Sequence, residues 1–260
     1  MACMDCHSER QWDQFAAPID KNRVGSGGQL FGHEDGIPGS FTAPNITPSH
    51  LNGWTDGELY RAITMGVSKN GRALFPVMPY LSYGKMDTED IYSVIAYLRT
   101  LPGVVSTTPE PVADFPMNFI INTIPKEAAP QSIPSQGNTL AYGAYLVRAA
   151  DCKGCHTADK GEDFSGGRPF KMPGSTTYSS NITTDLKTGI GAWTKEQFVA
   201  RFKSYANLSA AQPVRIGEFQ TNMPWRQFGK MTDADLIAVY TYLKSMKSVE
   251  NQVVKFKPDH

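Results

Sequence analysis

The stretch Cys3-Met4-Asp5-Cys6-His7 near the start of the chain has a counterpart in Cys152-Lys153-Gly154-Cys155-His156, and both read C-x-x-C-H. Together they use all four cysteines of the 260-residue chain and two of its five histidines. Each stretch brings two thiols and one imidazole within five consecutive residues. Because the pattern occurs twice, the sequence predicts two copies of one binding site.

C-x-x-C-H is the pattern by which haem c is attached to a polypeptide. Two thiols three residues apart reach both vinyl groups on one side of a porphyrin and form thioethers, and the adjacent imidazole binds the iron. The sequence therefore predicts two covalent haems c, with His7 and His156 as iron ligands. The attaching residues are Cys3, Cys6, Cys152 and Cys155. A C-x-x-C pair also serves tetrathiolate zinc sites and redox-active dithiols, but the trailing histidine and the duplication favour haem.

An internal repeat extends beyond the two motifs. At an offset of 145 residues Met78-Pro79 matches Met223-Pro224, and the match continues ungapped to Val104 and Val249. Further upstream the offset is 139, which pairs Trp54-Thr55 with Trp193-Thr194. Asn-Ile-Thr also repeats between these points, and these asparagines are either donors to haem propionates or parts of simple turns. The chain is thus predicted to contain two copies of one domain.

The repeat defines the expected domain organisation. We predict a first domain over residues 1–103, a connection over 104–136 and a second domain over 137–260. The connection does not repeat and is rich in proline. Apolar residues within it, such as Phe115 and Phe119, predict that it packs along both domains rather than hanging free.

The secondary-structure signals are helical. Thr55-x-x-Glu58 and Thr194-x-x-Gln197 are capping boxes that open a helix in each copy. Apolar residues at i, i+3, i+4 and i+7 predict a final helix in each copy, over Ile91–Leu98 and Leu236–Leu243. Residues 140–150 read as a further helix in which Gly143 allows close approach of another element. Since strand signals are weak, we predict an all-α fold of two tandem domains, each wrapped around one haem.

The sixth iron ligand decides between an electron carrier and a catalyst. The candidates are the thioethers of Met78 and Met223, which repeat beside proline in rigid loops. Met86 and Met231 also repeat, but each precedes a helix N-cap, so we assign them to packing. His33 and His50 are unmatched between the copies, and we interpret them as surface residues. The minority alternative is that one of the two replaces Met78 in one redox state.

Charge and hydropathy narrow the class of protein. Lys plus Arg equals Asp plus Glu, at 25 each, so there is no basic excess to indicate nucleic acid. No stretch approaches the 18 or so apolar residues of a membrane span. These features leave the partner protein open.

Taken together, these motifs resemble the haem-c domains of class I cytochromes c, in particular those of the multihaem cytochrome subunits of alcohol and gluconate dehydrogenases. The resemblance rests on C-x-x-C-H, Asn-Ile-Thr, Met-Pro-aromatic and Tyr-Leu in both copies, and on residues 114–118 between them. Those subunits have three haem domains and a membrane anchor, whereas this chain has two haem motifs and no anchor. Because Cys3 lies so early, we expect that a segment, with any signal peptide or lipid anchor, preceded residue 1.

The resemblance implies one-electron transfer through two His/Met-ligated haems without substrate turnover. Electrons would come from a dehydrogenase or another cytochrome and leave toward an oxidase or reductase. The expected location is the periplasm or another extracytoplasmic place, where haem c is attached. Two alternatives stay open, namely a cytochrome c subunit held in a dehydrogenase complex, and a di-haem peroxidase-type enzyme with one open iron face.

Overall fold

The structure, a computed structural model, describes residues 1–206 and 212–259. Their contacts divide the chain into two compact units, which are described separately. The N-terminal unit comprises Cys3–Arg10 and Ile19–Ile133. The C-terminal unit comprises Met1–Ala2, Gln11–Pro18 and Pro134–His260. Residues 11–18 therefore belong by their contacts to the unit that follows them in sequence.

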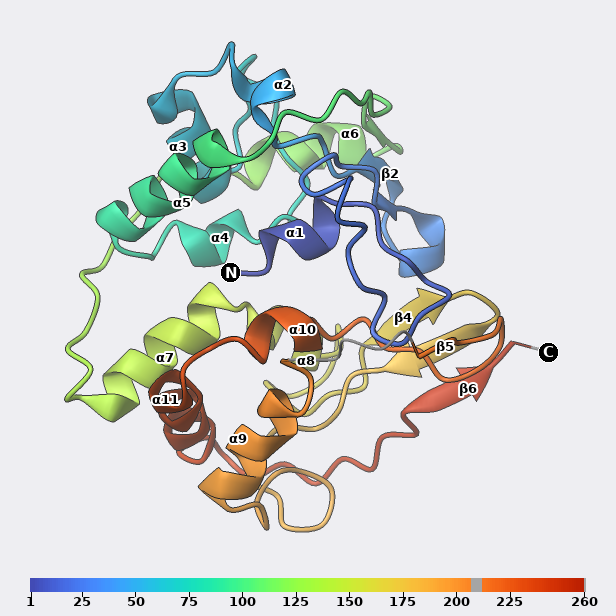
Figure 1. The fold of residues 1–260 in the computed structure, drawn as a ribbon, viewed down its shortest axis with the longest axis vertical. Coiled ribbons are helices and arrows are strands. Elements are labelled where there is room, and N and C mark those ends of the chain that lie inside the picture. Colours follow the sequence, from blue (N-terminus) through green and yellow to red (C-terminus); the bar gives the residue numbers. More distant parts are fainter. Residues whose placement is uncertain (207–211, 260) are drawn as a thin grey trace. The chain divides into compact units, whose positions relative to one another are not determined.

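The N-terminal unit consists of short helices and one small sheet (Figure 1). Its α-helices are α1 (Cys3–Cys6), α2 (Pro48–Leu51), α3 (Asp56–Met65), α4 (Tyr80–Tyr83), α5 (Thr88–Thr100) and α6 (Met117–Ile120). Two 3-10 helices span His33–Asp35 and Ile121–Thr123. The strands β1 (Leu30–Phe31), β2 (Gly39–Thr42) and β3 (Val112–Ala113) pair antiparallel in that order.

Two predicted helices of this unit are confirmed. Thr55 is the N-cap of α3 and forms the capping box with Glu58, so two backbone donors of the first turn are satisfied. Asp87 caps α5, whose apolar face buries Ile91 and Ile95 almost completely. Helix α5 ends at Thr100, two residues before Pro102.

The proline-rich connection has structure of its own. Its residues 112–113 form β3, which pairs with Gly39 and Ser40 of β2. Met117 and Ile121 pack into an apolar cluster of the same unit. Phe115 and Phe119 instead stay largely exposed, at 82% and 67%. The predicted packing therefore holds for part of the connection within this unit, while its two phenylalanines do not join the core.

The C-terminal unit repeats the helical arrangement with a larger sheet (Figure 1). Its helices are α7 (Thr139–Ala149), α8 (Cys152–His156), α9 (Lys195–Lys203), α10 (Trp225–Phe228) and α11 (Asp233–Leu243). The strands β4 (Pro169–Met172), β5 (Ser175–Tyr178) and β6 (Phe256–Pro258) pair antiparallel in that order. Thr194 and Thr232 form capping boxes at the starts of α9 and α11. The capping box at Thr194 is the one that the sequence predicted, and it is confirmed.

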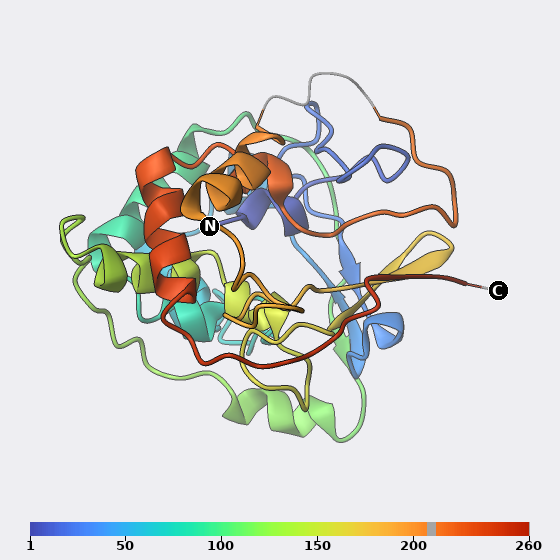
Figure 2. The same cartoon turned by 90° about the horizontal axis from the view of Figure 1, so that it is seen from below.

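Helices α7 and α11 cross in close contact, as the yellow-green and red helices of Figures 1 and 2 show. At the crossing a Cβ atom on Gly143 would lie 2.0 Å from the carbonyl oxygen of Ala238. Only glycine allows this approach, so the predicted role of Gly143 is confirmed. Val147 of α7 and Val239 of α11 join a core cluster that includes Phe164, against which Cys152 packs.

The prediction of an all-α fold is wrong. Helices make up 33% of the chain and strands 11%, with one three-stranded antiparallel sheet in each unit. The sequence signal was weak because the strands are only two to four residues long, too short to display alternation. Their outer strands, β3 and β6, come from the connection and the chain's last residues, which lie outside the repeat. Within the described residues, no helix has the length and apolar character needed to cross a membrane.

Candidate haem iron sites

Both C-x-x-C-H motifs fold into a single helical turn. Cys3–Cys6 form α1, which His7 extends through a hydrogen bond from its backbone N–H to the carbonyl of Cys3 (3.0 Å). Cys152–His156 form α8. Residues at i, i+3 and i+4 of a helix share one face. Each motif therefore presents two thiols and one imidazole on the same side of its helix.

Burial affects the ionisation of the motif cysteines. No disulfide joins either pair. Burial raises the pKa of Cys3 and raises those of Cys152 and Cys155 to about 12 and about 11. A redox-active dithiol needs a thiolate with a lowered pKa. In the part of the chain that the structure describes, no three His, Cys, Asp or Glu residues are arranged to hold a metal ion, as a tetrathiolate site would require. The zinc and dithiol alternatives thus lose support.

Each motif histidine is held by one backbone carbonyl. The Nδ1–H of His7 donates to the carbonyl oxygen of Pro44 (2.7 Å), and the Nδ1–H of His156 donates to that of Ser180 (2.7 Å). Burial lowers the pKa of both imidazoles. Both rings are therefore neutral, with the Nε2 lone pair left to bind a metal, and the carbonyl fixes the ring orientation.

The sequence Ser-Gly-Gly, which occurs at residues 26–28 and again at 165–167, makes this hydrogen bond possible. Gly27 and Gly166 both have φ +76° and donate their N–H groups to the carbonyls of His7 and His156. A Cβ atom at Gly166 would lie 2.4 Å from the carbonyl carbon of Ser180, and one at Gly27 would lie 2.6 Å from that of Pro44. A larger residue would displace the histidine's acceptor, which explains why glycine occurs at both positions.

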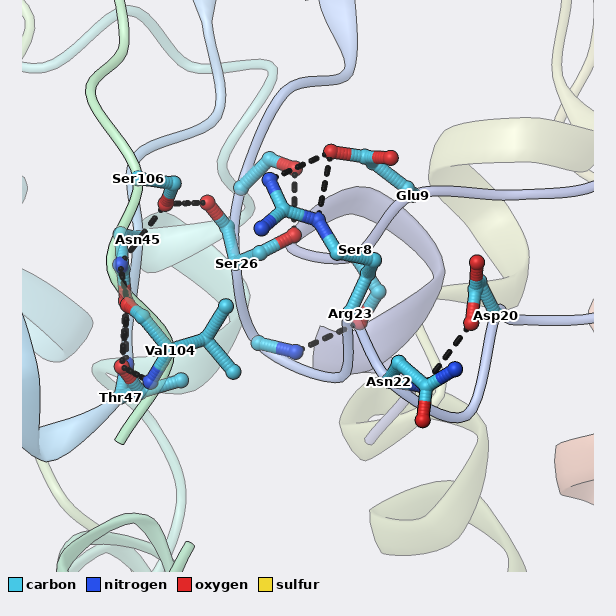
Figure 3. A network of polar contacts seen from close by, with 12 residues as sticks. Ser8, Glu9, Asp20, Asn22, Arg23, Ser26, Asn45, Thr47, Val104 and Ser106 are labelled. Atoms are coloured by element: carbon cyan, nitrogen blue, oxygen red, sulfur yellow. Dashed lines mark hydrogen bonds and ion pairs between the residues drawn. The ribbon is translucent and has the colours of Figure 1, made fainter. Parts of the chain in front are cut away.

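The repeated asparagines stabilise the same region through internal hydrogen bonds, as Figure 3 shows for Asn45. Asn45 accepts hydrogen bonds from the backbone N–H and hydroxyl of Thr47, and its amide donates to the carbonyl of Val104 (2.7 Å). Asn181 does the same with Thr183 and the carbonyl of Val249 (2.8 Å). Both amides are thus used inside the protein rather than offered to propionates. They tie the loop that carries the histidine's acceptor to the chain after the last helix.

The candidate sixth ligands occupy identical local structures. The N–H groups of Tyr80 and Trp225 bond to the carbonyls of Met78 (2.8 Å) and Met223 (2.7 Å) across the intervening prolines. The prolines have φ −79°, ψ 48° and φ −73°, ψ 54°, the geometry of an inverse γ-turn. Both methionines are half-buried. Each lies in the same unit as one motif histidine.

The other candidate ligands are either packed in the core of their unit or exposed. Met86 is 4% exposed, and Met231 packs against the core of its unit, which confirms their assignment to packing. His33 is exposed and pairs with Asp114 (2.6 Å). His50 is exposed on α2. The carbonyls of Pro44 and Ser180 were not foreseen. Their position directly before the repeated Asn-Ile-Thr was the available signal.

The arrangement fits covalent haem: two thiols and an oriented imidazole lie on one helical face, and a proline-bounded thioether lies in the same unit. Sites of this kind are typical of the c-type cytochromes as a class. In agreement, residues 140–247 match the model of the cytochrome c family. Residues 140–247 thus form a cytochrome c domain, and such a domain binds haem c and its iron covalently.

Comparison with known proteins shows which cytochromes the chain resembles. The chain is 26% identical, over 95% of its length, to the cytochrome c subunit of alcohol dehydrogenase (quinone) from Gluconacetobacter polyoxogenes. It is 27% identical, over 99%, to the gluconate 2-dehydrogenase cytochrome c subunit from Pantoea cypripedii. It spans only 54% and 59% of these relatives. A diheme cytochrome c-type from Cereibacter sphaeroides is 26% identical and is covered over 83% of its length. The resemblance inferred from the motifs is confirmed.

Proposed function

We propose that the chain carries single electrons through two haems c, one in each unit. The observation that supports a second haem is the repeated local geometry, since only the C-terminal half matches the family model. The N-terminal unit has the same histidine–carbonyl bond, the same left-handed glycine and the same methionine γ-turn as the C-terminal unit. In this proposal the haem domains span 1–103 and 137–260.

Each residue then has a defined task. The thiols of Cys3 and Cys6, and of Cys152 and Cys155, attach the porphyrins. The Nε2 atoms of His7 and His156 bind iron on one side and the thioethers of Met78 and Met223 bind it on the other. Haem iron so ligated supplies a one-electron couple of relatively positive potential. The chain orients the imidazoles through Pro44 and Ser180, keeps substrates from the iron and sets the burial of each site.

The partners follow from the relatives. Because two relatives bear the names of dehydrogenase cytochrome subunits, we infer that the electron donor is a dehydrogenase, with this chain as its subunit or its soluble acceptor. The electron acceptor would be an oxidase, a reductase or another cytochrome. We place the protein outside the cytoplasm, where haem c is attached.

Haem content and the ligation of the iron test this proposal. The purified chain should contain two haems, and Cys3→Ala/Cys6→Ala and Cys152→Ala/Cys155→Ala should each contain one. Met78→Ala and Met223→Ala should each remove about half of the sulfur-to-iron charge-transfer band of the oxidised protein. Met86→Leu and Met231→Leu are matched controls that should leave the band intact. A single haem per chain would refute the proposal. Rapid turnover of hydrogen peroxide would instead favour the peroxidase-type alternative.

A further inference from the structure

The two candidate methionine loops are anchored by chemically different residues at the same position of the repeat. Phe75 lies three residues before Met78, and Gln220 lies three residues before Met223. The ring of Phe75 stacks on Phe41, with centroids 4.5 Å apart, and packs against an apolar cluster. Gln220 is only 2% exposed, although glutamine is rarely buried to this extent.

Every polar atom of the Gln220 side chain has partners. Its Oε1 accepts from the backbone N–H groups of Ala16 (2.8 Å) and Thr221 (3.0 Å). Its Nε2 donates to the carbonyl oxygens of Trp12 (3.1 Å) and Gln14 (2.8 Å). Most of these partners lie in the segment Gln11–Pro18, which begins four residues after the end of the first motif but belongs to the C-terminal unit.

Two further backbone hydrogen bonds hold the segment Gln11–Pro18 to residues 212–214. The N–H of Phe15 donates to the carbonyl of Gln212 (2.8 Å), and the N–H of Val214 donates to that of Asp13 (2.8 Å). Ala16 and Ala17 have φ values of 58° and 37°, and both are buried. Left-handed alanines persist only where the surroundings determine the backbone conformation. The bond from Ala16 to Gln220 is part of that determination.

Gln220 is linked to Met223 through the neighbouring residue Thr221. The carbonyl of Gln220 accepts from the hydroxyl of Thr177 on β5 (2.7 Å), and the hydroxyl of Thr221 accepts from the N–H of Met223 (3.1 Å). The loop that carries Met223 is therefore held at its start by the sheet and by residues 11–18.

We propose that Gln220 is a positioning residue for Met223, and that it works by tying the methionine loop to the segment Gln11–Pro18. This inference rests on the proposed ligation by Met223. It implies that residues next to the first haem motif set the rigidity of the second haem's distal loop. The corresponding loop of the N-terminal unit obtains its rigidity from apolar packing at Phe75.

The test is competition between Met223 and added imidazole in the oxidised full-length protein. Gln220→Met keeps the side-chain volume but removes every hydrogen bond, and Gln220→Glu removes only the Nε2 donors. Loss of these bonds makes the open loop more populated, so imidazole should bind one of the two haems about tenfold to hundredfold more tightly. Glu218→Gln is the matched control, because it changes an exposed side chain on the same loop and keeps an acceptor for the N–H of Arg215. It should bind imidazole as the wild type does.

The outcomes separate the two proposals. If Met223→Ala leaves the charge-transfer band unchanged, ligation by Met223 fails and the inference fails with it. If Met223→Ala lowers the band but Gln220→Met and Gln220→Glu bind imidazole like the wild type, only the inference is overturned. Gln220→Met should have no further effect in a Met223→Ala background, because the ligand it positions is already gone. A similar gain in that background would show that Gln220 acts on general stability instead.

Discussion

Replacing Gly166 by alanine should destabilise the C-terminal haem site through two separate energetic costs. At φ +76° a residue with a Cβ atom costs about 1–2 kcal/mol. The new Cβ would also lie 2.4 Å from the carbonyl carbon of Ser180 and 2.5 Å from the backbone nitrogen of Asn181, so backbone must move. Such overpacking costs about 1–3 kcal/mol. We therefore expect Gly166→Ala to destabilise the C-terminal unit by about 2–5 kcal/mol.

Gly167 provides the matched control. It also has a left-handed conformation, at φ +88°, but its Cβ would meet no atom closer than 3.7 Å. Gly167→Ala should therefore cost only the conformational term, about 1–2 kcal/mol. Urea unfolding of the haem-loaded proteins, followed by circular dichroism and by haem absorption, measures the difference. Gly27→Ala should reproduce the larger effect in the N-terminal unit, since its Cβ would lie 2.6 Å from the carbonyl carbon of Pro44.

Gly166→Ala should also raise the reduction potential of one haem. Displacement of the Ser180 carbonyl weakens its bond to the Nδ1–H of His156, which makes the imidazole a less basic ligand and disfavours ferric iron. The reasoning is refuted if Gly166→Ala and Gly167→Ala unfold at the same urea concentration, or if neither potential changes in Gly166→Ala.

Three further outcomes are expected. Gly143→Ala should separate α7 from α11 and destabilise the C-terminal unit by several kcal/mol in the same unfolding assay, because its Cβ would overlap the carbonyl of Ala238. Asn181→Ala should lower the free energy of unfolding by about 3 kcal/mol, because the buried N–H and hydroxyl of Thr183 and the carbonyl of Val249 lose this partner. Asn181→Asp should retain part of this stability. The two units differ in charge: the N-terminal unit has nine Lys and Arg against thirteen Asp and Glu, and the C-terminal unit has sixteen Lys and Arg against twelve Asp and Glu. Reaction with charged redox reagents should therefore show two phases with opposite salt dependence. Identical salt dependence of both phases would contradict the last expectation.

The helices could be predicted from sequence because local rules determine them. The carbonyls of Pro44 and Ser180 could not, because they lie 37 and 24 positions from the histidines that they orient. A capping box at Thr55 or Thr194, and apolar spacing in α5 and α11, act within one or two turns of chain. The strands escaped prediction because their pairing joins residues far apart, such as Ser40 with Val112. A two-residue strand has no pattern of its own and exists only where its partner supplies hydrogen bonds.

The role of Gln220 escaped for a related reason. A single glutamine in a loop gives no local signal, and its partners at Trp12, Gln14 and Ala16 lie about 200 positions earlier in the chain. The repeat did contain an indirect signal, namely that a polar residue stands where the other copy has Phe75. A position at which the two aligned copies differ can therefore indicate a structural role, as a position at which they agree does.

The two sites share their histidine side and differ on their methionine side, and the aromatic residue after Met-Pro shows this directly. Tyr80 is fully buried against Gly66, where any Cβ would lie 2.5 Å from its ring. At the position that matches Gly66 by the upstream offset, the C-terminal unit has Tyr205, so Trp225 cannot enter and stacks on Tyr205 instead (4.7 Å), with Arg201 5.1 Å from its ring centroid. The histidine side is constrained by backbone geometry that only glycine and one carbonyl can provide, whereas the methionine side needs only rigidity, which several kinds of packing can supply. We therefore expect distal-ligand exchange, more than histidine chemistry, to distinguish the two proposed haems.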